Sequence, residues 1–321
     1  MGVGDLLDRL HVIALPMRVP FRGITVREVA LIDGPAGWGE FGPFVEYLPP
    51  EAAHWLAAAI ESAYRPRPAA LRTRIPVNAT VPAVRPGEVP GVLARFPGAK
   101  TAKVKVAEPG QTLAEDVARV DAVRAEVPTV RVDANGGWSV DEAVAAARAL
   151  TAGGPLEYLE QPCRTVPELA RLRRRVDVPV AADESIRKAA DPLAVVRAGA
   201  ADIAVLKVAP LGGIAAVLDI DARIDIPVVI SSALDSAVGI AAGLAAAAAL
   251  PRLEHACGLG TGGLFVTDIA DLTPVDGHLP VTGVVPDPAR LAELAASPQR
   301  RDWWIARVRE CFPLVGPAPV V

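Results

Sequence analysis

The sequence has 321 residues, 51% of them hydrophobic, and a formal net charge of −4. Such a chain has ample apolar surface for a large core and is too apolar to be disordered. Acidic and basic residues are mixed without a basic block, which gives nucleic-acid binding little support. The three cysteines form no CxxC pair, so neither a disulfide framework nor a zinc site is expected.

The start of the chain carries Asp5 and Asp8 and lacks the basic region of a signal peptide. The longest apolar run, 238–250, is too short to cross a bilayer. We therefore expect a cytoplasmic enzyme without a membrane partner. No feature of the sequence indicates an oligomeric state.

Residues 1–72 predict a small α+β unit. Apolar segments at 11–19 and 25–32, followed by the glycine-rich turn 34–43, indicate antiparallel strands. Pro49 and Pro50 then open a helix that runs to Tyr64.

From Ile75 onward, short apolar strands alternate with alanine-rich segments of helical length, such as 113–126 and 140–149. The predicted strands are 75–81, 102–107, 130–134, 156–160, 178–182, 203–208, 227–231 and 253–256. Their ends recur every 23–28 residues, which predicts a parallel α/β barrel of the TIM type over 73–285. Residues 286–321, with a short helix at 289–296, are expected to pack back on the first unit.

Five of these strands carry charged residues at or near their C-terminal ends. In chain order these are Lys103 and Lys105, Asp133, Glu160, Asp183, and Lys207. A buried charge is costly unless it is paired or binds a metal. Because the C-terminal ends of barrel strands meet at one mouth, the pattern predicts a polar centre there.

The three carboxylates, Asp133, Glu160 and Asp183, have no His or Cys near them in the pattern. An oxygen-only site favours Mg²⁺ over zinc or copper. Asn135 is placed to orient a ligand or a bound water. A single Asp after a barrel strand is often only a helix cap, but five charges in matching phase favour a catalytic centre.

The lysines supply acid/base groups. Lys103 and Lys105 lie two residues apart and so face the same side of their strand. Two close ammonium groups lower each other's pKa and make a base available near neutral pH. Lys207 lies across the mouth, which places one base on each face of a substrate. This arrangement suits removal of a proton alpha to the carboxylate of a small-molecule substrate.

Two segments follow the last strands, SSALDS (231–236) and GLGTGG (258–263). The second fits GxGxxG, but it ends a barrel rather than opening a dinucleotide-binding domain, so we reject that interpretation. Either segment forms a turn and helix cap, or it presents hydroxyl and N–H groups to an anionic substrate.

Together the motifs resemble those of the enolase superfamily, in its muconate-lactonizing-enzyme-like subgroup. They are FRG (21–23), GWGE (37–40), KVK (103–105), VDANGGW (132–138), EQP (160–162), ADES (182–185) and LK (206–207). The resemblance implies that Asp133, Glu160 and Asp183 bind Mg²⁺ and that Lys105 and Lys207 are the acid/base lysines. It also implies that the first unit and the tail cap the barrel mouth.

Within the subgroup, the short chain and SSALDS make the sequence most similar to a dehydratase. That resemblance implies substrate contacts from Arg131, Ser232 and the backbone of Gly258 to Gly260. An N-succinylamino-acid racemase or a dipeptide epimerase is the alternative, although GLGTGG lacks the acidic pair usual in the epimerases. A non-catalytic ligand-binding barrel is the alternative from another class.

Overall fold

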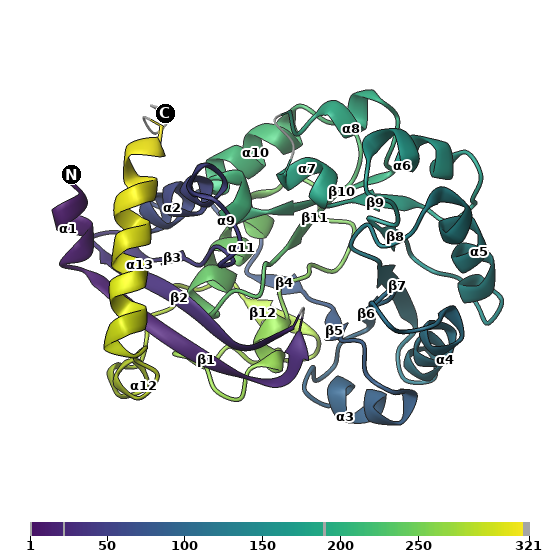
Figure 1. Ribbon diagram of the computed structural model, residues 1–321, viewed down its shortest axis with the longest axis horizontal. Coiled ribbons are helices and arrows are strands. Elements are labelled where there is room, and N and C mark those ends of the chain that lie inside the picture. Colours follow the sequence, from purple (N-terminus) through teal and green to yellow (C-terminus); the bar gives the residue numbers. More distant parts are fainter. Residues whose placement is uncertain (1, 22, 189–190, 317–321) are drawn as a thin grey trace.

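The computed structural model describes residues 2–21, 23–188 and 191–316. Figure 1 shows two parts, a cap built on a small sheet and an α/β barrel beside it. Arg22 of the FRG motif lies outside the described residues.

The cap contains an antiparallel sheet in the order β1-β2-β3, formed by Leu10–Phe21, Ile24–Gly34 and Gly37–Phe41, and follows the short helix α1 (Val3–Leu7). Helix α2 (Pro49–Tyr64) packs on this sheet and buries small residues, including Ala59. The backbone approach is close because a Cβ at Gly39 would overlap the carbonyl oxygen of Ala59. The glycines of GWGE therefore let the helix lie directly on β3.

Gly39→Ala is expected to lower the free energy of unfolding by about 1–3 kcal/mol, because α2 must move away from β3 to make room. Urea unfolding measures this. Gly87→Ala is the matched control, because a Cβ there meets nothing within 4 Å. An unchanged free energy of unfolding in the Gly39 variant would show that α2 can move away from β3 without cost.

Seven parallel strands form the barrel sheet, in the order β11-β10-β9-β8-β7-β6-β5. From β5 to β11 they are Ala79–Val81, Thr101–Lys105, Thr129–Asp133, Leu159–Glu160, Val180–Ala182, Ile203–Lys207 and Val228–Ser231. The helices between them are α3 (Val89–Leu93), α4 (Leu113–Arg124), α5 (Val140–Thr151), α6 (Val166–Arg173), α7 (Glu184–Arg187), α8 (Ala194–Arg197), α9 (Val208–Leu211) and α10 (Ile214–Ala222), and α11 (Ala237–Ala249) follows β11. The predicted α/β barrel of the TIM type with an N-terminal cap is confirmed.

Two residues close the barrel. Cys257 bridges in parallel to Val77, and Gly258 bridges in parallel to Ser231 at the end of β11. The eighth strand predicted at 253–256 is therefore wrong, since the pairing falls on the two residues that follow. The first predicted strand is also split, because β4 (Arg74–Pro76) leaves the barrel and pairs antiparallel with β12 (His278–Pro280).

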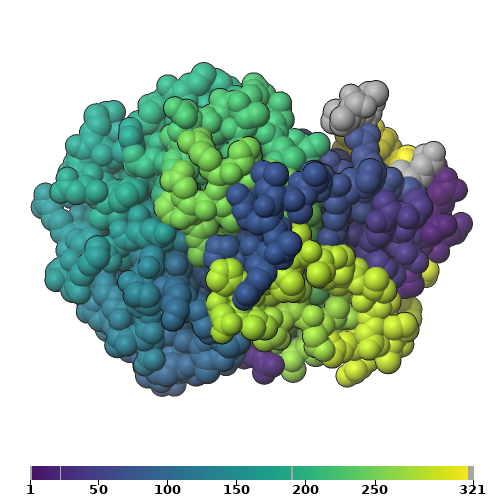
Figure 2. Space-filling model, turned by 180° about the vertical axis from the view of Figure 1, so that it is seen from behind, coloured from purple at the N-terminus to yellow at the C-terminus, as the bar shows by residue number. Residues whose placement is uncertain are grey.

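The C-terminal segment returns to the cap through α12 (Pro288–Glu293) and α13 (Pro298–Cys311). Trp304 Nε1 donates to Glu28 Oε2 of β2 at 3.0 Å, and its ring meets Phe41 edge-on. Figure 2, seen from behind, shows these yellow residues beside the purple N-terminal ones. The boundaries 1–72, 73–285 and 286–321 stay a prediction.

Helix α13 was not predicted. Its buried residues are Trp304, Arg307, Val308 and Cys311. That spacing is a helical stripe, but one of its four members is an arginine, so a search for apolar residues alone misses it. Across the described ranges, no helix is long and apolar enough to pass through a membrane.

Candidate active site

The predicted charges meet at the C-terminal edge of the barrel sheet. Lys105, Asp133 and Glu160 are the last residues of β6, β7 and β8, and the strand register pairs them as neighbours. Asp183 directly follows β9, and Lys207 ends β10. All five side chains are buried, as is Lys103.

Lysines and carboxylates form ion pairs at the strand ends. Lys105 Nζ lies 2.5 Å from Asp133 Oδ2, and Lys207 Nζ lies 2.6 Å from Asp183 Oδ2. Lys103 Nζ lies 2.7 Å from Glu160 Oε1 and 3.3 Å from Asp133 Oδ2. Buried charges of opposite sign thus compensate one another, which the low dielectric of this region requires.

The two neighbouring lysines have opposite pKa shifts. Burial lowers the pKa of Lys105, Asp133 opposes this, and Lys103 lowers it further. Burial also acts to lower the pKa of Lys103, but Glu160 and Asp133 outweigh it and raise that pKa above its ordinary value. The expectation that the two ammonium groups lower each other's pKa therefore holds for Lys105 and is wrong for Lys103, whose carboxylate partners prevail.

The carboxylates also differ. Burial and the neighbouring Asp133 raise the pKa of Glu160 to about 7. Burial acts in the same direction on Asp183, but Lys207 and Arg187 outweigh it and hold its pKa at about 2. Asp133 is likewise held below its usual range, against the effect of burial, by Lys105 and Lys103.

A pocket of about 40 Å³ opens beside these ion pairs, and we call it the strand-end pocket. Glu160 and Asp183 are not among the described residues that line it. Lys103, Lys105, Asp133 and Lys207 line it, together with the predicted residues Asn135, Ser232 and Gly258. Phe21, at the end of β1, and Phe44, which follows β3, also line it. The structure thus brings together residues from both parts.

Asn135 holds Lys105 in place. Its Oδ1 accepts from Lys105 Nζ at 2.7 Å, and its Nδ2 donates to Glu184 Oε1 at 3.2 Å. Its φ of 46° lies in the left-handed region, which asparagine tolerates better than most residues.

Ser232 lies on the opposite wall. Its hydroxyl contacts Gly258 O and Thr261 Oγ1, each at 2.9 Å. This links the SSALDS segment to the GLGTGG segment beside the pocket.

Two residues predicted to contact substrate do not line the pocket. Arg131 lies on β7 two residues before Asp133, and its guanidinium is held by Glu157, Tyr158 and the Ala256 carbonyl. It is therefore engaged one layer below the mouth. Gly260 packs instead against the backbone of Asn78. A Cβ at position 260 would lie 2.7 Å from the carbonyl oxygen of Asn78.

Arg187 lines the pocket and was missed. Its guanidinium donates to Asp183 Oδ1 at 3.0 Å and Glu184 Oε1 at 2.7 Å, and to the hydroxyl of Tyr47 at 3.2 Å. Its position four residues after Asp183, on the helix that Glu184 opens, was the available signal.

No group of three or more His, Cys, Asp or Glu side chains within the described ranges is arranged to hold a metal ion. The three carboxylates instead pair with lysine and arginine side chains. Their chemistry still fits Mg²⁺, because three neighbouring carboxylates offer only oxygen ligands. Moreover, Glu160 Oε2 is buried and has no hydrogen-bond partner among the described residues, so one ligand oxygen is already free.

The cap also positions one wall of the pocket. Glu40 of GWGE accepts from Ser236 N at 3.0 Å and from Gly239 N at 3.1 Å, at the start of α11. Arg27 of β2 donates to Leu234 O at 3.1 Å. Residues 232–234 line the pocket, so these two cap side chains fix the loop that carries them.

Glu40 makes stability depend on pH. Burial and the nearby Asp235 raise its pKa to about 8, against the opposing effects of Ser236 and Arg27. Between its ordinary value of 4.5 and about 8, the folded chain binds a proton that the unfolded chain does not. The contribution of Glu40 to stability is therefore present at low pH and is lost as the pH rises through this window.

Glu40→Gln is expected to flatten that dependence, because an amide does not titrate. Urea midpoints at about pH 5 and about pH 8 measure it. Asp268, whose pKa burial raises to about 6, acts in the same direction and is retained in both proteins, so the difference isolates Glu40. Equal slopes for the two proteins would contradict the assignment.

A cap over a parallel barrel, with carboxylates and lysines at the strand ends, defines the class of the protein, and comparison with known families agrees. Residues 12–63 match the family described as "Enolase N-terminal domain-like", and residues 93–287 match "Enolase C-terminal domain-like". The chain belongs to the enolase superfamily, as its motifs predicted. Enzymes of this superfamily are generally Mg²⁺-dependent.

Curated relatives share high sequence identity with this chain over nearly its whole length. The chain is 76% identical to the o-succinylbenzoate synthase of Mycobacterium marinum, over 97% of this chain and 95% of that protein. It is 76% identical to the o-succinylbenzoate synthase of Mycolicibacterium smegmatis, over 98% of each. For the o-succinylbenzoate synthase of Mycobacterium tuberculosis strain H37Ra, identity is 74% over 98% of this chain and 96% of that protein.

Solved structures share the fold at low identity. Muconate lactonizing enzyme from Pseudomonas fluorescens, complexed with muconolactone, superposes with a TM-score of 0.74 at 22% identity, covering 90% of this chain and 98% of that one. The L-Ala-D/L-Glu epimerase from Bacillus subtilis also gives a TM-score of 0.74 at 22% identity, over 86% and 96%. These likenesses support the fold alone.

Proposed function

We propose that the chain is an o-succinylbenzoate synthase, the dehydratase that its sequence resembles most within the subgroup. It would convert 2-succinyl-6-hydroxy-2,4-cyclohexadiene-1-carboxylate to 2-succinylbenzoate and water, a step of menaquinone biosynthesis in the cytoplasm. The observation that carries the proposal is the 74–76% identity with mycobacterial synthases over nearly the whole chain. A small-molecule carboxylate substrate also fits a pocket lined by lysines.

Asp133, Glu160 and Asp183 would hold Mg²⁺. Its chemistry there is to stabilise the negative charge that develops on the substrate carboxylate. Lys207 and Arg187 hold the pKa of Asp183 low and so keep this carboxylate ionised, and Lys103 lies against Glu160. These cations hold the two carboxylates at the strand ends.

Lys105 is the proposed acid/base residue. Its lowered pKa makes loss of its own proton easier, and the neutral amine then takes the proton alpha to the carboxylate as that C–H bond breaks. The electron pair then displaces the hydroxyl group as its C–O bond breaks, and the new Lys105 ammonium gives its proton to the leaving oxygen. One lysine thus serves both steps on one face, and water is the second product.

Lys207 lies on the other side of the pocket, paired with Asp183. Its ammonium group stabilises the developing negative charge from the opposite face. Asn135 orients Lys105 through its amide oxygen, and Ser232 and Gly258 lie where they can contact the substrate. The pocket holds only about 40 Å³, well below the range of small-molecule sites, so its walls must move apart to admit the substrate.

The test is a direct assay with Mg²⁺ and the cyclohexadiene substrate, in which loss of substrate absorbance reports dehydration. Absence of turnover would overturn the proposal. Proton–deuterium exchange on N-succinyl amino acids in D₂O separately measures racemisation. Exchange without dehydration would assign the chain to the racemases instead.

A further inference from the structure

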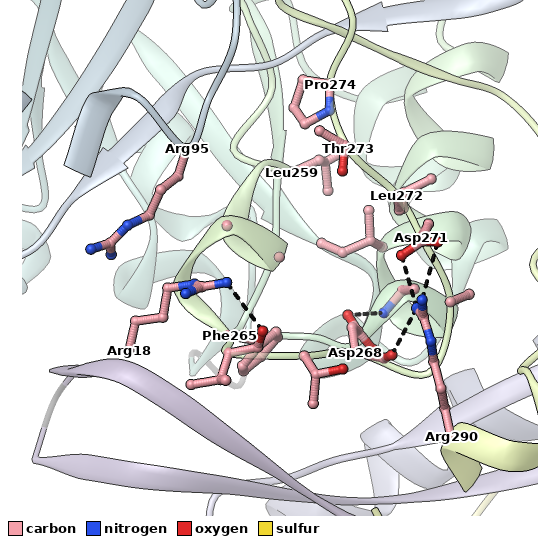
Figure 3. Close-up of a pocket in the computed structure, with 17 residues that line it drawn as sticks. Arg18, Arg95, Leu259, Phe265, Asp268, Asp271, Leu272, Thr273, Pro274 and Arg290 are labelled. Atoms are coloured by element: carbon pink, nitrogen blue, oxygen red, sulfur yellow. Dashed lines mark hydrogen bonds and ion pairs between the residues drawn. The ribbon is translucent and has the colours of Figure 1, made fainter. Parts of the chain in front are cut away.

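A second cavity, of about 450 Å³, lies beside the strand-end pocket, and Figure 3 shows it in close-up. The two share a wall. Gly258 and Thr261 of the GLGTGG segment line the strand-end pocket, whereas Leu259, Gly262 and Gly263 line the second cavity. The volume falls in the range of small-molecule sites.

Two arginines from different parts of the chain lie at one end of this space. Arg18 belongs to β1 of the cap and Arg95 follows α3 of the barrel, and Figure 3 shows both guanidinium groups on the same side. Arg18 is exposed, and its Nη2 donates to Val266 O at 3.1 Å. Arg95 Nη1 is buried and finds no hydrogen-bond partner among the described residues.

Within the same described ranges, neither arginine pairs with a carboxylate. Two like charges that face one cavity repel each other, and an unpaired buried guanidinium nitrogen is costly. An anion between them would remove both penalties. A planar carboxylate suits this role, because guanidinium groups bind it through paired hydrogen bonds.

The opposite end of the cavity is already satisfied. Arg290 pairs with Asp271 through two contacts of 2.8 and 3.1 Å. The carboxylate of Asp268 accepts from Ala237 N at 3.0 Å and from Ile269 N at 2.7 Å. A second negative group on the ligand would meet these acids, so a single carboxylate is favoured.

The walls between the two ends carry apolar side chains, including Leu259, Phe265 and Leu272. They suit an apolar body attached to the carboxylate. We propose that this space, the arginine cavity, is a second binding site for a small organic monocarboxylate, held by Arg18 and Arg95.

Calorimetric titration with benzoate tests the site. We expect wild-type protein to bind benzoate and Arg95→Met to bind it at least tenfold more weakly. Arg95→Lys should have an intermediate affinity, because lysine keeps the charge and cannot form the paired hydrogen bonds of a guanidinium group. Arg148→Met, which removes an exposed arginine on the outer helix α5, is the matched control and should bind as wild type. Melting temperatures verify that each variant is folded.

Two outcomes would overturn the proposal. Benzoate affinity that falls in Lys207→Ala and is unchanged in Arg95→Met and in Arg18→Met would place the ion in the strand-end pocket. Inorganic phosphate that binds as tightly as benzoate would show that the apolar walls contribute nothing to recognition. Neither result depends on whether the chain dehydrates the cyclohexadiene substrate, since no turnover is measured.

Discussion

Replacing Lys105 by alanine should lower kcat/KM for dehydration by about a thousandfold or more, the range expected for loss of a general acid/base. The reason is structural: Lys105 is the buried lysine whose pKa is lowered, and Asp133 and Asn135 hold its Nζ in the strand-end pocket. Absorbance kinetics with saturating Mg²⁺ measure the loss. Lys105→Arg should lose a similar factor, because arginine keeps the charge and cannot give up its proton.

The matched control is Lys100→Ala, which removes an exposed lysine just before the same strand. It should keep wild-type kinetics. Full activity in Lys105→Ala would show that another group removes the proton, with Lys207 the first to examine.

Asp183→Asn should weaken Mg²⁺ binding by at least about 10- to 100-fold. Mutation of residues that only hydrogen-bond to metal ligands already causes a loss of this size. Binding is read without turnover, from calorimetry and from the rise of the melting temperature with added Mg²⁺. In the variant the same rise should need at least about 10- to 100-fold more Mg²⁺. The melting temperature without Mg²⁺ should also fall, because Lys207 and Arg187 lose their charged partner.

Asp177→Asn provides the comparison, since Asp177 is an exposed acid just before the N-terminal end of β9, away from the strand end that Asp183 follows. Its Mg²⁺ response should equal that of the wild type. An Asp183 variant that kept full Mg²⁺ affinity would remove this carboxylate from the proposed ligand set.

The barrel was predictable because each βα unit carries its own signals. Helices α4, α5 and α6 begin with capping boxes, in which Thr112, Ser139 and Thr165 each pair with a Glu three residues later. The split first strand and the two-residue closure were not predictable. Their pairing partners, β12 and the ends of the sheet, lie up to about 200 residues away, and local pattern carries no such information.

The candidate site was also predictable only in part. Strand ends and period two predicted that Lys105, Asp133 and Glu160 meet, because parallel strands end at one edge. Period two also places Arg131 on the face of Asp133, but it does not report depth, and Arg131 is held one layer lower. The opposite pKa shifts of Lys103 and Lys105 depend on which carboxylate each amine reaches across strands, which the sequence does not specify.

The two-residue closure of the barrel has a dynamic consequence. Among the described residues, only Cys257 and Gly258 form the backbone bridges that join the two edges of the sheet, at Val77 and at Ser231. Each side of this seam has one bridged residue pair, whereas neighbouring barrel strands share at least two. Its amides should therefore exchange with solvent deuterium by local opening, ahead of those in β6 and β7. Gly258 also borders the strand-end pocket, so the place where the barrel opens most readily is one wall of the site.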